Sequence, residues 1–142
     1  MSRPSKLRIL VADDHFAVRM GLATSINAEP DMAVVAEAAD GAEAIEKYRE
    51  IDPDLVLMDV RLPGPDGIQT TAAICLEFPE ARIIALTISV GEESRRRAIN
   101  AGACACLAKA TEREEILETI RAVARGEYRL PAELAPHRAR LN

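Results

Sequence analysis

The chain has 142 residues, the size of a single domain, and 49% of them are hydrophobic. No apolar run approaches the roughly 20 residues that cross a bilayer, and the N-terminal sequence turns acidic where a signal peptide would stay apolar, so we expect a cytoplasmic protein that does not bind membranes. The net charge of -5 and the pI of about 5.1 argue against direct nucleic-acid contact by this chain.

Five short apolar segments alternate with segments of helical period, which predicts an α/β fold with a parallel sheet and crossover helices. Several of these segments are apolar at consecutive positions, as strands covered on both faces are. The predicted strands are Leu7 to Asp13, Met32 to Ala38, Asp54 to Asp59, Arg82 to Thr87 and Ala103 to Lys109.

The helices are predicted between these strands. The first carries Val18, Leu22 and Ile26 at four-residue spacing, and the last carries an apolar stripe that includes Ile116 and Ile120. Three helix starts are predicted from a capping side chain three residues before an acid or amide. These pairs are Asp40 with Glu43, Asp66 with Gln69, and Thr111 with Glu114. Gly102 is predicted to end the fourth helix.

The character of the chain changes after Arg125, where two prolines and scattered charges replace the apolar period. We therefore expect residues 1–125 to form one domain. Residues 126–142 are interpreted as a C-terminal tail or as a linker to an output domain absent from this chain.

Polar side chains follow the carboxyl ends of four predicted strands: Asp13 and Asp14, Asp59, Thr87 and Lys109. In an open parallel sheet these ends share one edge, and ligands bind where the strand order reverses. We therefore expect these residues to converge.

The charges of this cluster indicate the ligand. Two carboxylates about 4 Å apart repel by roughly 4 kcal/mol at an effective dielectric of about 20, and Lys109 alone cannot offset three of them. Oxygen ligands with room for water favour Mg²⁺, and Mg²⁺ suggests phosphate. Asp59 could then attack phosphorus, while Lys109 and the Thr87 hydroxyl stabilise the phosphoryl oxygens.

This pattern resembles the receiver domain of bacterial two-component response regulators over residues 6 to about 125. The family has paired acids after the first strand, an aspartate and a P-G-x-D-G turn after the third, and Thr and Lys after the next two. The matching residues are Asp13, Asp14, Asp59, Pro63 to Gly67, Thr87 and Lys109.

The resemblance implies a flavodoxin-like (CheY-like) doubly wound (βα)5 fold with strand order 2-1-3-4-5. It implies that Asp14, Asp59 and the Arg61 backbone carbonyl contact Mg²⁺, with Asp13 acting partly through water. It also implies that a sensor histidine kinase phosphorylates Asp59, and that the domain slowly catalyses its own phosphorylation and dephosphorylation without a separate metabolic reaction.

The run ADDHFAVRMGL is similar to the NarL/FixJ (LuxR-type) subfamily, whose members usually add a helix-turn-helix output module that binds DNA. The resemblance therefore implies control of transcription through altered partner binding or a receiver homodimer. One position departs from the family: Cys106 stands where an aromatic residue commonly turns inward together with the Thr at the position of Thr87. Thr87 and Cys106 are the expected switch residues.

Simpler interpretations exist for each residue, because a lone strand-end aspartate is more often a helix cap. The joint pattern outweighs them for the acids, Thr87 and Lys109. His15 is interpreted as a solvated helix-start residue, Arg95 to Arg97 as the solvated face of the fourth helix, and the three cysteines as free thiols. Cys104 and Cys106 are two residues apart on a predicted strand, so we expect them to share one face of the sheet and to serve in packing. The rival functions are a phosphorylation-independent interaction module, a stand-alone receiver, and a phosphotransferase or phosphatase for small metabolites.

Overall fold

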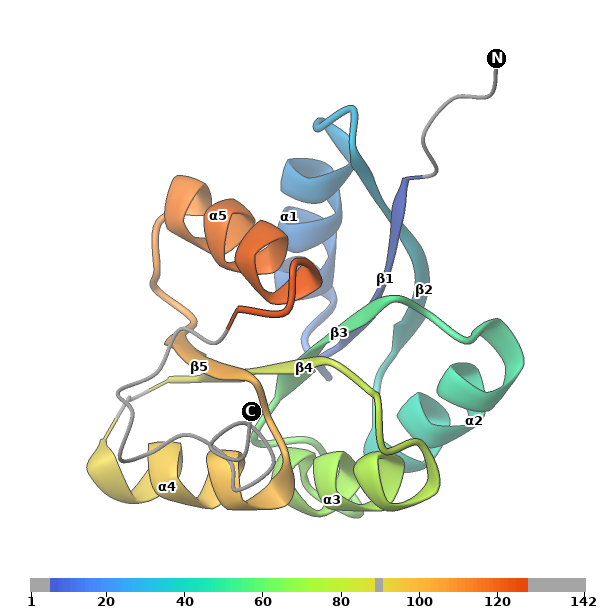
Figure 1. Cartoon of the computed structure of the whole chain (residues 1–142), viewed down its shortest axis with the longest axis vertical. Coiled ribbons are helices and arrows are strands. Elements are labelled where there is room, and N and C mark those ends of the chain that lie inside the picture. The colour runs from blue at the N-terminus through green and yellow to red at the C-terminus, as the bar shows by residue number, and fades with distance from the viewer. Residues whose placement is uncertain (1–5, 89–90, 128–142) are drawn as a thin grey trace.

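A computed structural model describes residues 6–88 and 91–127 of the chain (Figure 1). Its elements alternate strand and helix throughout, as the sequence predicts. The strands are β1 (Leu7–Ala12), β2 (Met32–Ala38), β3 (Leu55–Asp59), β4 (Ile83–Thr87) and β5 (Ala105–Ala108). The helices are α1 (Phe16–Asn27), α2 (Gly41–Ile51), α3 (Gly67–Glu77), α4 (Glu92–Ala101) and α5 (Arg113–Ala124).

The five strands form one parallel sheet in the order β2-β1-β3-β4-β5, which confirms the predicted topology. Figure 1 shows α1 and α5 on one face of the sheet and α2, α3 and α4 on the other. The strand order reverses between β1 and β3, so the carboxyl ends of these two strands flank the crevice where such sheets bind ligands.

The core has a layer on each side of the sheet. Ile9, Leu57 and Ile84 pack with α1 and α5 on one side, and Leu10, Val56 and Met58 pack with α2 and α3 on the other. Because both faces are covered, β3 and β4 are buried along their whole length. No helix in the described part of the chain is both long and apolar enough to span a membrane.

Two of the three predicted helix starts are confirmed. The Asp40 carboxylate accepts a hydrogen bond from the Glu43 N–H at 2.8 Å, and Asp66 and Gln69 form a reciprocal capping box. The prediction at Thr111 was wrong: the Thr111 N–H donates to the Ala108 carbonyl in a turn, and α5 starts later with Glu112 at its N-cap. Gly102 ends α4 with a φ of 118°, as predicted.

None of the three cysteines forms a disulfide within the described residues, and Cys104 and Cys106 are buried. Their spacing on a predicted strand placed both on one face of the sheet, but this expectation was wrong. Cys104 packs with the α1 and α5 layer, whereas Cys106 packs beside α4. The reason is that β5 begins only at Ala105, so the alternation of a strand does not extend back to Cys104.

Candidate functional site

The predicted acidic residues meet at the carboxyl edge of the sheet. β1 ends at Ala12, which is paired with Met58 of β3, so Asp13 lies level with Asp59 on the neighbouring strand. Asp13 and Asp59 are fully buried, while the Asp14 side chain is 35% exposed. One ligand atom from each of these residues and from His15 lies within 4.8 Å of the others, so the predicted convergence is confirmed.

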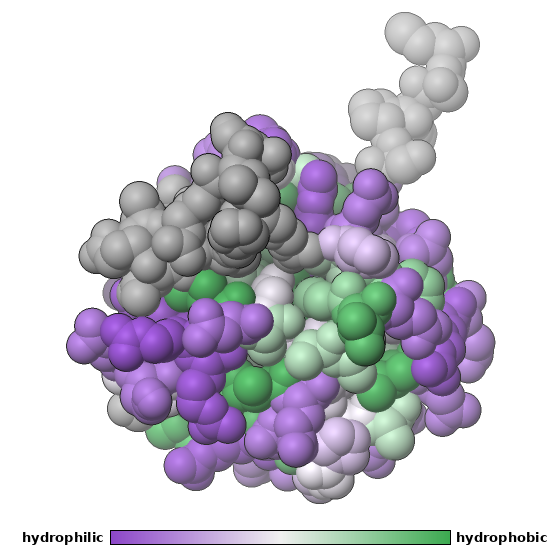
Figure 2. Space-filling view, turned by 60° about the horizontal axis from the view of Figure 1, so that its bottom comes forward, coloured by the Kyte–Doolittle hydropathy of each residue, from purple (hydrophilic) through white to green (hydrophobic). Residues whose placement is uncertain are grey.

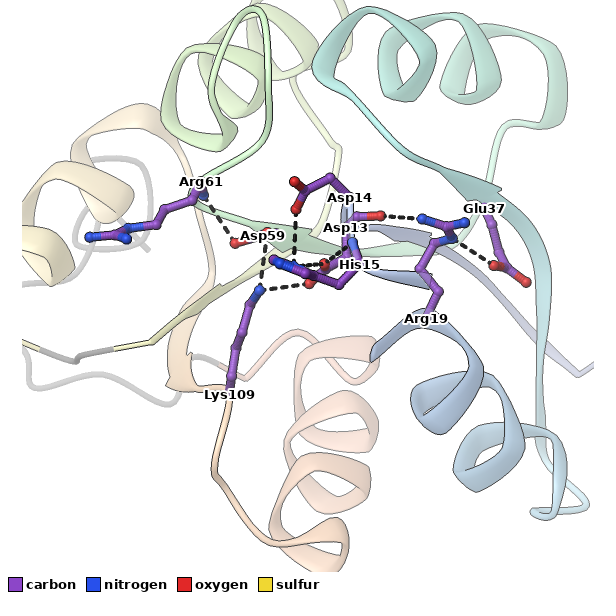
Figure 3. A network of polar contacts seen from close by, with 8 residues as sticks. All are labelled: Asp13, Asp14, His15, Arg19, Glu37, Asp59, Arg61 and Lys109. Carbon is purple, nitrogen blue, oxygen red and sulfur yellow. Dashed lines mark hydrogen bonds and ion pairs between the residues drawn. The ribbon is translucent and has the colours of Figure 1, made fainter. Parts of the chain in front are cut away.

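Lys109 follows β5 and reaches across the edge of the sheet to both buried carboxylates (Figure 3). Its Nζ lies 2.8 Å from Asp13 Oδ2 and 3.1 Å from Asp59 Oδ2. Burial alone would lower the pKa of Lys109, but its contacts with the two carboxylates raise the pKa overall. The side chain is therefore a cation at neutral pH, and three carboxylates face a single positive charge from the lysine.

Thr87 and Arg61 flank Asp59. Asp59 is paired with Leu86, so Thr87 lies one residue beyond it at the end of the adjacent strand, where it is buried. The Lys109 N–H donates to the Thr87 carbonyl at 2.7 Å, which connects the two strand ends. The Arg61 N–H donates to Asp59 Oδ1 at 3.0 Å, so both Asp59 oxygens have a polar partner and the carboxylate is held in one orientation.

His15 is the N-cap residue of α1 and is 63% exposed, in agreement with a solvated residue at a helix start. Its ring does not point away from the acids, however. Nδ1 lies 3.2 Å from Asp13 Oδ1 and 3.1 Å from Asp14 Oδ1, because the tight turn after β1 folds the ring back over the cluster (Figure 3). His15 is thus a neighbour of the site that the sequence did not place there.

Cys106 lies among small side chains beside α4. It packs with Ala85, Ala98 and Ala103, and burial raises the pKa of its thiol, an effect that Arg95 partly offsets. A buried thiol with a raised pKa is a poor nucleophile at neutral pH, which supports a packing role over redox sensing.

The arginine run of α4 is mostly solvated, as predicted. Arg96 and Arg97 are exposed, and Arg96 pairs with Glu92 at 3.5 Å. Figure 2 shows this helix at the left as a mostly hydrophilic surface. Arg95 differs, because it is half-buried and its Nε has no hydrogen-bond partner in the part of the chain that the structure describes.

Two residues near the site were missed by the sequence analysis. Arg19 of α1 donates from Nη1 to the Asp13 carbonyl at 2.6 Å and from Nε to Glu37 of β2 at 2.9 Å. A signal for Arg19 was present, because it is the only charged residue in the helix sequence FAVRMGLATSIN. Glu37 had no such signal, because a single acid in the β2 sequence MAVVAEA is typical of a solvent-exposed strand position.

The fold and this edge cluster define the class of the protein. The chain belongs to the response regulator receiver domain family, whose sequence profile matches residues 9–121. It is a receiver of the NarL/FixJ type, as the sequence resemblance predicted, and is related to transcription-regulating proteins of the LuxR type.

Individual relatives support this assignment. The transcriptional regulatory protein LiaR of Bacillus subtilis is 41% identical over 91% of this chain and 61% of LiaR. The signal receiver domain of NarL from Mycobacterium tuberculosis is 33% identical with a TM-score of 0.84, over 87% of this chain and all of that domain. A LuxR-family response regulator structure from Aurantimonas sp. SI85-9A1 is 37% identical with a TM-score of 0.85, over 97% of this chain and 100% of that chain.

The chain spans about three fifths of the length of the curated relatives it matches. The prediction for residues 126–142 falls largely on residues 128–142, which lie outside the described part of the structure.

Proposed function

We propose that this receiver is a phosphorylation-dependent signalling switch that accepts a phosphoryl group on Asp59 from a sensor histidine kinase. The observation that supports it best is the fully buried Asp59 carboxylate, held by Arg61 and Lys109 beside two further acids at the edge of the sheet. Three carboxylates that share one cation repel one another and destabilise the fold, so this arrangement favours a functional role over a structural one.

The residues present fit Mg²⁺. The cluster offers hard oxygen ligands, and two buried oxygens, Asp13 Oδ2 and Asp59 Oδ2, have only the Lys109 ammonium as a partner among the described residues. Asp14, Asp59 and the Arg61 carbonyl would hold the ion, with Asp13 acting partly through water. When bound, Mg²⁺ would neutralise charge on the cluster and on the incoming phosphoryl group.

The chain's own groups account for the transfer step. A carboxylate oxygen of Asp59 forms a bond to phosphorus while the bond from phosphorus to the donor nitrogen of the kinase histidine breaks, and the electron pair stays on the imidazole. Lys109 and the Thr87 hydroxyl then interact with the phosphoryl oxygens. Attack by water on the same phosphorus returns Asp59, so the domain would be a slow catalyst of its own dephosphorylation with no separate metabolic reaction.

The output is proposed to pass from Thr87 to the surface beside Cys106 and α4, altering partner binding or homodimerisation. In a longer protein, residues 1–125 would form the receiver and residues 126–142 would link it to a helix-turn-helix module that controls transcription. The small Cys106 side chain favours one alternative, a phosphorylation-independent interaction module, because the aromatic group of the usual switch is missing. A stand-alone receiver is the other alternative.

Phosphoryl transfer can be tested by intact mass measurement after incubation with Mg²⁺ and acetyl phosphate. The switch predicts a gain of one phosphoryl group per chain, which should disappear when the metal is removed with a chelator. Normal Mg²⁺ binding without any mass gain would contradict the switch and support a constitutive interaction module.

Lys109→Ala is expected to leave the fold intact and to uncouple phosphorylation from any change in self-association. Lys109 lies at the edge of the sheet and belongs to neither layer of the hydrophobic core, so its removal leaves the core packing unchanged. Among the described residues it is the lysine that contacts Asp59, and the variant lacks that contact. Size-exclusion chromatography with light scattering, before and after acetyl phosphate treatment, would measure this. If the variant changed its association state as the parent does, Lys109 would have no coupling role.

A further inference from the structure

Arg19 turns inward from α1 although the rest of the solvent-facing surface of that helix is uncharged. Its side chain is only 16% exposed. The guanidinium contacts the Asp13 carbonyl at 2.6 Å and Glu37 Oε1 at 2.9 Å (Figure 3). It also lies 5.8 Å from the centre of the Phe16 ring. An arginine fork used in this way fixes the two groups it contacts relative to each other.

The carbonyl that Arg19 contacts belongs to the peptide unit joining Asp13 to Asp14. A peptide unit is planar, so anchoring its oxygen fixes the orientation of the Cα atoms at both ends. Both carboxylates project from those Cα atoms. Arg19 therefore acts on two acids of the cluster through a single hydrogen bond.

Asp13 has other anchors. Its N–H donates to the Ala38 carbonyl at 3.0 Å, its Oδ1 accepts from the His15 N–H at 2.8 Å, and its Oδ2 pairs with Lys109. Each polar group of Asp13 thus has a partner. Its carbonyl is the group that depends on Arg19.

Asp14 has far less support. Within the described residues, the only polar partner of its carboxylate is the exposed His15 ring, at 3.1 Å. The direction of the Asp14 side chain therefore depends chiefly on the peptide unit that it shares with Asp13. Because Arg19 holds that unit, it controls Asp14 more than Asp13.

We infer that Arg19 is a positioning residue for the acidic cluster, which holds the Asp13–Asp14 peptide so that both carboxylates face Asp59. Glu37 orients Arg19 and balances its charge, so Arg19 acts by geometry and adds little net positive charge to the cluster. The effect of Arg19 on Mg²⁺ binding rests on the function proposed above. The effect of Arg19 on the orientation of the Asp13–Asp14 peptide does not depend on that function.

The test compares the parent with Arg19→Met and Arg19→Lys, and uses Arg49→Met as a matched control. Like Arg19, Arg49 pairs with a glutamate, Glu77, but it does so through two nitrogens and lies in the last turn of α2, at the opposite edge of the sheet. Urea unfolding of each variant would separate local effects from a general loss of stability.

The first measurement is amide hydrogen exchange at His15 in the metal-free protein. Arg19→Met should accelerate exchange of this N–H severalfold, because its bond to Asp13 Oδ1 closes a turn that contains the Asp13–Asp14 peptide held by Arg19. The second is Mg²⁺ affinity by calorimetric titration, which should weaken by about tenfold in Arg19→Met, as is typical when a group supporting a metal ligand is lost. Arg19→Lys should recover part of the affinity, and Arg49→Met should match the parent.

The outcomes separate the two proposals. If the parent binds Mg²⁺ and Arg19→Met matches it in both affinity and His15 exchange, the positioning role is wrong. If the parent itself does not bind Mg²⁺, the proposed function fails, and the His15 exchange rate still decides whether Arg19 holds the peptide.

Discussion

Asp59→Ala is expected to abolish the gain of a phosphoryl group from acetyl phosphate while leaving the domain folded. The nucleophilic oxygen is lost, and Asp13 and Asp14 follow β1, which does not pair with β4, so neither replaces Asp59 beside Thr87. The fold should survive because Lys109 keeps its 2.8 Å contact with Asp13 and is not left as an unpaired cation. Intact mass and far-ultraviolet circular dichroism measure the two effects.

A matched control for this variant is Asp54→Ala, which removes the aspartate that directly precedes the same strand. Asp54 accepts a hydrogen bond from the Arg8 N–H at 2.9 Å and lies at the edge opposite the cluster. This variant should incorporate phosphoryl as the parent does. Stoichiometric incorporation by Asp59→Ala would place the nucleophile elsewhere, and peptide mapping would then locate it.

Gly67→Ala is expected to lower the free energy of unfolding by about 3 kcal/mol, at the upper end of the cost of overpacking. A Cβ atom at Gly67 would lie 2.0 Å from the Asp59 carbonyl oxygen and 2.7 Å from the Val60 Cα. Both are backbone atoms, so no side chain can rotate away. Since the strained backbone belongs to Asp59, the variant should also incorporate phosphoryl more slowly.

The control for this substitution is Gly21→Ala on the exposed side of α1. A Cβ at Gly21 would meet no atom within 4 Å. Alanine in a helix interior is favoured over glycine by roughly 1 kcal/mol, so this variant should be more stable than the parent. Urea unfolding followed by circular dichroism measures both, and a Gly67→Ala protein as stable as the parent would contradict the close approach of α3 to β3.

Most of the fold and the core of the site could be predicted because they follow from short-range patterns. Apolar runs specified the strands, and parallel connection brought Asp13, Asp59 and Lys109 to one edge whatever the details of packing. The errors arose where position depends on the exact start of an element. Thr111 and Cys104 each lie just outside α5 and β5, so neither the capping rule nor strand alternation applied to them.

The contacts of Arg19 and His15 could not be predicted for a different reason. Both sets of contacts depend on the side-chain conformation that each residue adopts in the folded protein. The apolar periodicity of α1 does not specify side-chain conformations. Arg19 has one partner directly after β1 and another in β2, which lie 6 and 18 residues away in the sequence. Only the packed structure identifies such partners.

The small side chains beneath α4 have a consequence for local stability. Only Ala98 and Ile99 of this helix are buried, and the sheet meets it with Ala85 and Cys106. Hydrophobic stabilisation follows buried apolar area, so less free energy holds this helix in place than holds its neighbours α2, which buries three residues, and α3, which buries four. Opening of α4 alone is therefore the least costly partial unfolding on this face of the sheet, and the domain can rearrange there without disturbing the acidic edge.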